Sequence, residues 1–250
     1  MKNLFIVGAQ RSGSTYLYEA LDDHPQISMA HPVRPEPKFF LNERLFELGR
    51  DSYEDNYFND RKSGSLYLGE KSTSYIESIE AAQRIHAYYP DARILMILRN
   101  PIQRAYSNYL FSVAHKLETL TFMDALKAES GRLSGSRFSS SVNPYAYRQR
   151  GRYIDYIESY AKVFSPSQLY ILIFEEFVNN LADVHALYRW LGVDESFVPN
   201  SLGRVVNPST LERENQLHAF KDLALGYHES NCRLENYLGR RISAWHGYIG

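Results

Sequence analysis

Residues 8–15 form a polar loop with two glycines that follows an apolar run. Gly8 and Gly13 lie five residues apart, and Ser14 and Thr15 open an apolar-periodic run that continues with Leu17. This spacing predicts a strand, a tight loop and the N-terminus of a helix. Such a loop is suited to cradle a phosphate-like anion, because free backbone N–H groups point into it and the helix dipole adds about half a positive charge.

The cation of this loop does not stand where a nucleotide-binding P-loop has it. In the pattern G-x-x-x-x-G-K-[ST] a lysine follows the second glycine, whereas this chain has Ser14 at that place and its cation earlier, at Arg11. A loop that keeps the anion cradle but moves the cation favours a nucleotide other than ATP. Taken alone, the loop leaves open an ordinary turn between a strand and a helix capped by serine.

The rest of the chain predicts the elements that must position this loop. Short apolar runs predict strands, and apolar residues with a period of 3.6 predict helices. The predicted strands are 3–7, 26–29, 66–70, 92–98 and 168–174, and the predicted helices are 14–23, 43–59, 76–89, 101–116, 121–130, 145–164 and 181–191, before a polar C-terminal third with a helical pattern. Alternating strands and helices imply an α/β fold, namely one P-loop-like domain over residues 1–250 whose central parallel sheet is flanked by helices on both faces.

Two connecting segments have unusual compositions. Residues 31–40 contain three prolines, which stiffen the chain into an extended path and allow it to hold a side chain in place without regular structure. Residues 131–143 are rich in serine and glycine, which predicts a mobile loop or lid.

The composition bounds the partners and the compartment. With 28 basic and 29 acidic residues the net charge is −1, so the chain has no global attraction to nucleic acid or anionic membrane, and any anion site must be local. Cys232 is the single cysteine, which excludes an internal disulfide and a thiolate metal cluster. No window reaches the ~18–20 apolar residues of a membrane span, and the first apolar run is too short for a signal peptide. We therefore expect a cytoplasmic protein that binds neither nucleic acid nor membrane.

Four blocks in a definite order carry a resemblance to a known family. They are Gln10-Arg11-Ser12-Gly13-Ser14-Thr15, then Glu36-Pro37-Lys38-Phe39-Phe40, then Glu70-Lys71-Ser72-Thr73-Ser74-Tyr75, and finally Leu98-Arg99-Asn100-Pro101 with Ala105-Tyr106-Ser107-Asn108-Tyr109. Together they resemble the sulfotransferases that use 3′-phosphoadenosine 5′-phosphosulfate (PAPS), in the group that includes heparan-sulfate-type and many bacterial members. Weaker likeness extends to Gly151-Arg152-Tyr153, Phe174-Glu175-Glu176-Phe177 and the region of Trp245.

The resemblance implies a reaction and a cofactor site. The sulfuryl group of PAPS would pass in line, without a metal, to a hydroxyl or amine of a small-molecule or carbohydrate acceptor, releasing adenosine 3′,5′-bisphosphate (PAP). The phosphosulfate end would lie on the opening loop, on Arg11, Ser12, Gly13, Ser14 and Thr15. The 3′-phosphate would lie on Arg99 and Ser107, and Arg99 directly follows a predicted strand, where ligands of parallel sheets bind.

Sulfuryl transfer also needs a base for the acceptor's proton and a cation at the transferring group. The resemblance assigns the base to Glu36, which the proline-stiffened segment can hold in place. His31 is the second candidate for the base, because an imidazole titrates near neutrality. Lys71 is the predicted cation, and Arg11 is placed to stabilise charge on the bridging oxygen as the S–O bond breaks. Lys38 is expected near the acceptor entrance.

The chain departs from the family pattern at three places. Thr73 stands where the family usually has proline, so the fit of that loop is open. No clear counterpart of the family's late basic-glycine loop is found, and residues 204–210 are the candidate substitute for completing the 3′-phosphate site. The K-x-H motif of steroid-type cytosolic members is absent, which argues against that subgroup.

Two other functions compete with sulfuryl transfer. A P-loop kinase using ATP and Mg²⁺ is disfavoured by Ser14 in the lysine position and by Arg99 where an aspartate would follow the 92–98 strand. A non-enzymatic module that binds an anion or a partner protein would need no base at all. The near-neutral charge and the length favour a small-molecule acceptor, such as a specialised metabolite, over a strongly anionic polymer.

Overall fold

The structure, a computed structural model, describes residues 1–135, 143–204 and 213–248. The chain divides into two compact units. One comprises Met1–Leu98 with Glu158–Val206, and the other comprises Arg99–Ile157 with Asn207–Gly250. The expectation of a single domain over residues 1–250 stays a prediction, and each unit is described by itself.

The first unit contains the sheet. Its five strands are all parallel and have the order β2-β3-β1-β4-β5. Their bounds are β1 Lys2–Gly8, β2 Ile27–Met29, β3 Tyr67–Lys71, β4 Arg93–Leu98 and β5 Leu169–Ile173. The predicted strands are confirmed to within about two residues, and the apolar 3–7 run lies in the central strand, as a buried parallel strand requires.

The helices agree less closely with their predicted positions than the strands do. Those in the first unit are α1 Ser14–Asp23, α2 Glu43–Phe46, α3 Gly49–Tyr57, α4 Ile79–Tyr88, α8 Phe174–Phe177 and α9 Leu181–Leu191, with 3₁₀ turns η1 Phe39–Leu41, η2 Tyr75–Glu77 and η4 Pro166–Gln168. The second unit contains α5 Pro101–Ala114, α6 Phe122–Gly135, η3 Gln149–Gly151, α10 Arg213–Leu238 and η5 Ser243–Tyr248. Helix α7, Tyr153–Tyr160, spans the boundary between the units in the sequence.

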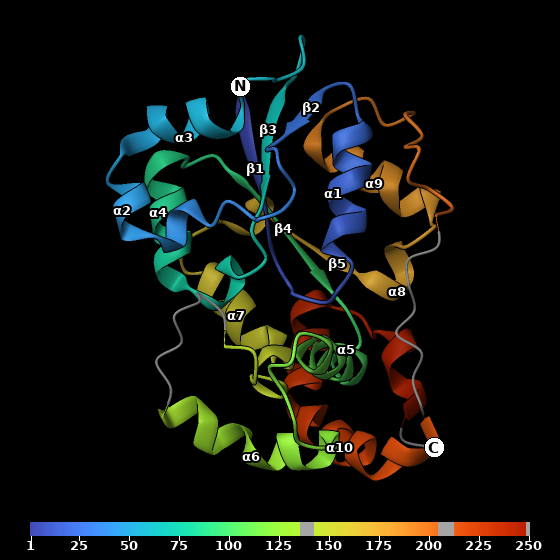
Figure 1. The fold of residues 1–250 in the computed structure, drawn as a ribbon. Coiled ribbons are helices and arrows are strands. Elements are labelled where there is room, and N and C mark those ends of the chain that lie inside the picture. The colour runs from blue at the N-terminus through green and yellow to red at the C-terminus, as the bar shows by residue number, and fades with distance from the viewer. Residues whose placement is uncertain (136–142, 205–212, 249–250) are drawn as a thin grey trace. The chain divides into compact units, whose positions relative to one another are not determined.

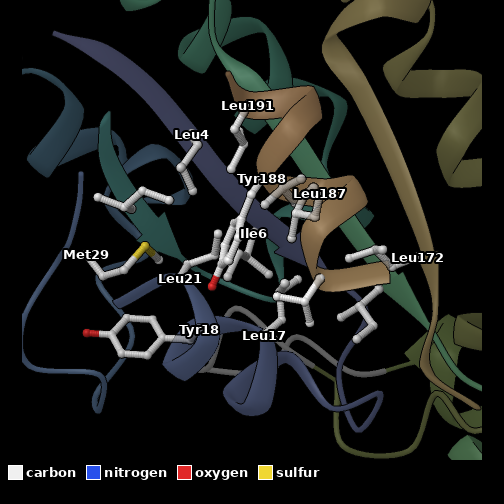
Figure 2. Packing of buried hydrophobic residues seen from close by; sticks show 14 of the residues in the cluster. Leu4, Ile6, Leu17, Tyr18, Leu21, Met29, Leu172, Leu187, Tyr188 and Leu191 are labelled. Atoms are coloured by element: carbon white, nitrogen blue, oxygen red, sulfur yellow. The ribbon is translucent and has the colours of Figure 1, made fainter. Parts of the chain in front are cut away.

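Helices cover both faces of the sheet, as Figure 1 shows with α1 and α9 on one side and α3 and α4 on the other. Successive side chains of a strand point to opposite faces, so Leu4 and Ile6 of β1 face the same side. They pack with apolar residues of α1 and α9, among them Leu17 and Leu187, in the cluster of Figure 2. This packing fixes the start of α1, and with it the loop that precedes the helix.

The opposite face of the sheet carries an aromatic cluster that anchors the 36–40 segment. Phe5 of β1 meets Phe40 of η1 edge to face, with 5.6 Å between ring centroids. Tyr53 of α3 lies 4.9 Å from the ring of Phe39 and 5.1 Å from that of Phe40, and all four rings are fully or almost fully buried. The two phenylalanines therefore hold the end of the proline-rich segment against the sheet.

The second unit has a core of its own. Residues of α5, α6 and α10 form it, including Tyr106, Phe122 and Phe220. The ring of Tyr106 lies 5.1 Å from that of Phe122 and 5.5 Å from that of Phe220. These contacts hold helix α5, which carries Ser107, one of the two candidate residues of the 3′-phosphate site.

The long helix predicted over 145–164 is wrong. The segment forms the 3₁₀ turn η3 and the shorter α7. The N–H groups of Arg148 and Gln149 donate to the Glu129 carboxylate, and the Tyr227 hydroxyl donates to the Arg148 carbonyl. At Gly151 a Cβ would come within 2.5 Å of that hydroxyl. Backbone N–H and carbonyl groups that a continuous helix would pair with one another are thus bonded to side chains from elsewhere in the second unit.

Two further predictions differ from the structure. The helix predicted over 43–59 is interrupted between α2 and α3, because Gly49 has φ +87° and a right-handed helix cannot continue through that conformation. Of the predicted mobile loop 131–143, residues 131–135 are helical as the end of α6, and 136–142 lie outside the described residues. Among the helices that are described, none is both long and apolar enough to cross a membrane.

Candidate active site

The opening loop has the backbone of an anion cradle. β1 ends at Gly8 and α1 begins at Ser14, whose preceding residue Gly13 caps the helix in the left-handed region (φ +83°) without any side-chain cap. Arg11 also has a positive φ, +64°, and its side chain is exposed. Ser12 is fully buried, and its hydroxyl has no hydrogen-bond partner among the described residues. An uncapped helix start beside an unsatisfied hydroxyl and an arginine fits the phosphosulfate end of PAPS.

Glycine at position 13 is required by packing as well as by conformation. A Cβ at this position would lie 2.3 Å from the ring of Phe174, the first residue of α8, which follows β5. Since β4 pairs with β5 in parallel, the sheet brings Phe174 beside the loop from the far end of the first unit's sequence. The loop is therefore shaped partly by a residue 161 positions away, counting from 13 to 174.

We expect Gly13→Ala to lower the free energy of unfolding by about 2–5 kcal/mol, from backbone strain plus the clash with Phe174, and to weaken PAP binding. Gly49→Ala is the matched control, because Gly49 has the same sign of φ but no atom within 4 Å of the place that a Cβ would occupy. That control should cost only ~1–2 kcal/mol. Urea unfolding and calorimetric PAP titration measure both. Equal losses in the two variants would show that Phe174 does not constrain the loop.

Glu36 and Lys71 are brought together in the first unit. The Lys71 Nζ donates to the Glu36 Oε1 at 2.7 Å, and the two side chains are 15% exposed for Glu36 and 4% exposed for Lys71. Lys71 is the last residue of β3, so the sheet fixes its backbone, whereas Glu36 reaches it from the proline-rich segment. The pair places a carboxylate and an ammonium group side by side, as a base and a cation for group transfer must be.

Thr73 completes this contact. Its backbone N–H donates to the Glu36 Oε2 at 3.1 Å, and its hydroxyl lies 3.0 Å from Oε1 and 3.1 Å from Oε2. A proline at this position has neither an N–H nor a hydroxyl to offer. The departure from the family pattern at Thr73 therefore supplies donors that orient Glu36. The sequence showed an unusual residue inside the motif, but it did not show that this residue would bind Glu36.

The structure does not bring His31 to the Glu36–Lys71 pair. Its Nδ1 lies 3.3 Å from the Tyr18 hydroxyl, and its Nε2 lies 3.5 Å from the Asp22 carboxylate. Among the described residues it has no hydrogen bond or ion pair with Lys71. Glu36 is thus the better-placed candidate base of the two named from the sequence.

The candidate 3′-phosphate residues lie in the second unit. Arg99 directly follows β4, and its Nε and Nη2 each donate to the Gln103 side-chain oxygen at 3.2 Å. Its carbonyl accepts from the hydroxyl of Tyr153, the last residue of the weaker Gly-Arg-Tyr likeness. Ser107 is buried, four residues beyond Gln103 on α5. Residues spaced by four lie along one helix face, so Gln103 and Ser107 share a face of α5. Gln103 binds the side chain of Arg99 and Tyr153 binds its carbonyl, and the sequence analysis assigned neither role.

Arg99→Ala is expected to weaken PAP binding by ~1.5–3 kcal/mol, which is about 10- to 150-fold in Kd, because it removes a charge-assisted contact to the phosphate. Isothermal titration with PAP measures the loss. Arg189→Ala, which removes an exposed arginine of α9, is the control and should bind PAP as the unchanged protein does. Normal affinity in Arg99→Ala would contradict the 3′-phosphate assignment.

The remaining candidates are placed as follows. Lys38 has φ +51°, and its backbone N–H donates to the Ser72 hydroxyl at 2.9 Å. Of the proposed substitute loop 204–210, Arg204 pairs with Glu19 at 3.7 Å, and residues 205–210 lie outside the described residues. Within the described part of the chain, no three His, Cys, Asp or Glu side chains are grouped to hold a metal ion.

A parallel α/β sheet has an anion cradle after β1 and an acid–cation pair at the end of β3, which is the arrangement of a P-loop-like protein that binds an anionic nucleotide. The sequence model of the family described as "Sulfotransferase domain" matches residues 1–231. The chain belongs to this family, whose general reaction is transfer of the sulfuryl group from PAPS. Membership of this family disfavours the P-loop kinase.

Known structures and relatives agree with the family. A sulfotransferase crystal structure from Alicyclobacillus acidocaldarius is 30% identical and covers 98% of both chains, with a TM-score of 0.80. A mouse sulfotransferase, SULT7A1, solved in complex with PAP, shares the fold at 16% identity and a TM-score of 0.51, over 95% of this chain and 88% of that one. The Caenorhabditis elegans bifunctional heparan sulfate N-deacetylase/N-sulfotransferase 1 is 30% identical over 203 residues, which is 78% of this chain. The chain spans only 22% of the length of that relative.

Proposed function

We propose that Glu36 acts as the general base and Lys71 as the cation in sulfuryl transfer to an amine or hydroxyl of a sugar or other small molecule. The observation that carries this proposal is the 2.7 Å contact between the Lys71 ammonium and the Glu36 carboxylate, almost buried and held further by Thr73. A base must be positioned by neighbouring groups before it can take a proton in the transition state, and this carboxylate has three such donors.

Each group has a separate task. When bound, PAPS supplies an activated sulfuryl group attached through a phosphosulfate bond. The α1 N-terminus and Arg11 hold the phosphosulfate end, and Arg99 with Ser107 hold the 3′-phosphate. Glu36 receives the proton of the acceptor's hydroxyl or amine at one of its carboxylate oxygens. The Lys71 ammonium stabilises the negative charge that develops nearby, where a fixed cation in a dry site contributes most.

The acceptor class follows from chemistry and from the names of relatives. The curated relatives are named N-sulfotransferases of heparan sulfate, which favours an amino-sugar nitrogen as the acceptor atom. The near-neutral net charge of −1 favours a small acceptor, an oligosaccharide or a specialised metabolite, over a long polyanion. A cytoplasmic location remains part of this proposal and is tested by fractionating cells that express the tagged chain.

A turnover screen tests the acceptor. We would measure PAP release from PAPS with an N-desulfated heparan-type oligosaccharide, the same oligosaccharide N-acetylated, and a panel of small phenols, alcohols and amines. Turnover with the free amine but not with its acetylated counterpart supports N-sulfation of an amino sugar. Turnover only with small hydroxyl compounds supports a small-molecule acceptor instead. No PAP release with any member of the panel, together with a thermal shift by ATP–Mg²⁺ but not by PAP, contradicts the proposed function.

A further inference from the structure

Glu70 is a buried carboxyl group that the proposed mechanism does not use. It is the residue before Lys71 on β3 and has no exposed surface. One carboxylate oxygen accepts from the Tyr53 hydroxyl at 2.6 Å, and the other accepts from the Ser72 hydroxyl at 2.5 Å. The buried Tyr75 side chain also interacts electrostatically with Glu70. Two hydroxyl groups thus donate to one carboxyl inside the first unit, with Tyr75 nearby.

The Ser72 hydroxyl and the neighbouring Tyr75 hydroxyl also hold the backbone that carries Glu36. The Ser72 Oγ accepts the Lys38 N–H at 2.9 Å, and the Tyr75 Oη accepts the Phe40 N–H at 3.1 Å. Both N–H groups belong to the 36–40 segment, which starts at Glu36. The other hydroxyl that donates to Glu70, that of Tyr53, has no such link, because it belongs to α3 and its only hydrogen bond in the described residues is the one to Glu70.

The direction of these hydrogen bonds depends on the charge of Glu70. A hydroxyl has one proton to donate and lone pairs with which to accept, whereas an ionised carboxylate only accepts. Against ionised Glu70, the Ser72 hydroxyl must turn its proton toward the carboxylate. Its lone pairs then face the Lys38 N–H group. A neutral carboxyl must itself donate to one hydroxyl, which disturbs this order.

We propose that Glu70 is a positioning residue for sulfuryl transfer, which acts through the Ser72 hydroxyl to fix the 36–40 segment and so hold Glu36 against Lys71. The inference rests on the proposed role of Glu36 as the base. Glu70 does not contact the reacting groups; its contribution is to make the segment that bears the base rigid and correctly placed, since a small misplacement of a catalytic group is costly in rate.

Burial gives this role a pH dependence. It raises the pKa of Glu70 to about 7, so the carboxyl changes charge near neutrality. The ionised form orders the hydroxyls, and kcat is therefore expected to rise with pH through about 7. The titratable groups that face Glu70 are Tyr53 and Tyr57 of α3, Tyr75 of η2, Tyr160 of α7 and Glu36 of the 36–40 segment. Burial raises the pKa of each of these tyrosines above its usual value, so they stay neutral across this range.

Ser72→Ala and Tyr53→Phe form a matched pair of variants. Each removes one hydroxyl from Glu70, but only Ser72 also binds the 36–40 segment. We expect Ser72→Ala to lower kcat by about 10- to 100-fold, with the Kd for PAP unchanged within about twofold. Tyr53→Phe should lower the unfolding midpoint and leave kcat within about twofold. An equal loss of kcat in both variants would show a general structural effect and overturn the inference.

Hydrogen exchange separates this inference from the proposed function, because it needs no turnover. The Lys38 and Phe40 amides should exchange faster in Ser72→Ala than in Tyr53→Phe, which should resemble the unchanged protein. Unaltered exchange in Ser72→Ala contradicts the positioning role even if Glu36 is the base. Conversely, full activity in Glu36→Gln removes the role of Glu36 while the exchange result still reports on the hydroxyl network.

Glu70→Gln tests the titration. The wild-type rise of kcat through about pH 7 should be absent from this variant, which cannot ionise. Folded Glu70 keeps its proton to higher pH than in the unfolded chain, so it stabilises the wild type below about pH 4.5, and this stability is lost as pH rises through 7. Denaturation midpoints should therefore fall with pH in the wild type relative to Glu70→Gln. If kcat of Glu70→Gln still rose with pH through about 7, the proposed pH dependence through Glu70 would be overturned.

Discussion

Glu36→Gln is expected to lower kcat by about 10²- to 10⁴-fold, the range that general-base catalysis contributes. Glutamine has nearly the same shape and can still accept from Lys71 and Thr73 through its amide oxygen, but it cannot take a proton from the acceptor. Steady-state kinetics with the best acceptor of the panel measures the loss. The Kd for PAP should stay within about twofold, since Glu36 is assigned to the acceptor and not to the nucleotide.

The control for this prediction is Glu47→Gln. Glu47 is an exposed glutamate that follows α2, in the same unit as Glu36. Its replacement changes the net charge equally and should leave kcat unchanged. If Glu36→Gln retained the kcat of Glu47→Gln, Glu36 would not be the base, and His31, held by Tyr18 and Asp22, would become the next residue to replace.

Lys71→Met is expected to lower kcat by about 10²- to 10³-fold, because it removes a fixed charge from the transferring group in a site with little water. Methionine keeps an unbranched apolar stem of similar length, so packing around β3 is disturbed little. The Lys71 side chain is only 4% exposed. Breaking the pair also leaves the Glu36 carboxylate uncompensated, so a loss of ~3–5 kcal/mol in the free energy of unfolding accompanies the kinetic effect.

Kinetics and unfolding must therefore be measured together. Lys71→Arg retains the charge and should recover part of kcat relative to Lys71→Met, whereas Lys127→Met, which removes an exposed lysine of α6, should leave kcat and unfolding unchanged. In the double variant with Glu36→Gln, the losses in kcat should be smaller than the sum of the single losses on a free-energy scale, because the two residues act as a unit. Simple additivity would contradict the assignment of both residues to one step.

Much of the fold followed from local pattern. The five strands and the helices α1 and α9 agree with their predicted positions because each has a clear apolar period and a clear terminus. The helix predicted over 145–164 failed for the opposite reason. Its backbone groups are taken up by Glu129 and Tyr227, which are distant in sequence, so no local pattern contained the information.

The candidate site shows the same division. Arg11, Gly13, Glu36 and Lys71 were named from motifs, since a motif records which residue types occur at which spacing. The part played by Thr73 was not, because its two donors matter only once the 36–40 segment lies beside the end of β3. The roles of Phe174, Gln103 and Glu70 were not predicted for the same reason, although Phe174 and Glu70 stand in the matched blocks.

The sequence by itself determined the anion cradle at residues 8–15 and the parallel α/β class, because these depend on spacing within short segments of chain. The proposed transfer chemistry came from the resemblance of four blocks to a family. The tertiary structure alone decided that Glu36, and not His31, meets Lys71, and that Thr73 orients the carboxylate. A contact between residues 35 positions apart depends on how a stiff segment docks on a strand end. That docking is set by buried rings and hydroxyls, the side chains of Phe40, Ser72 and Tyr75, whose partners no sequence spacing specifies.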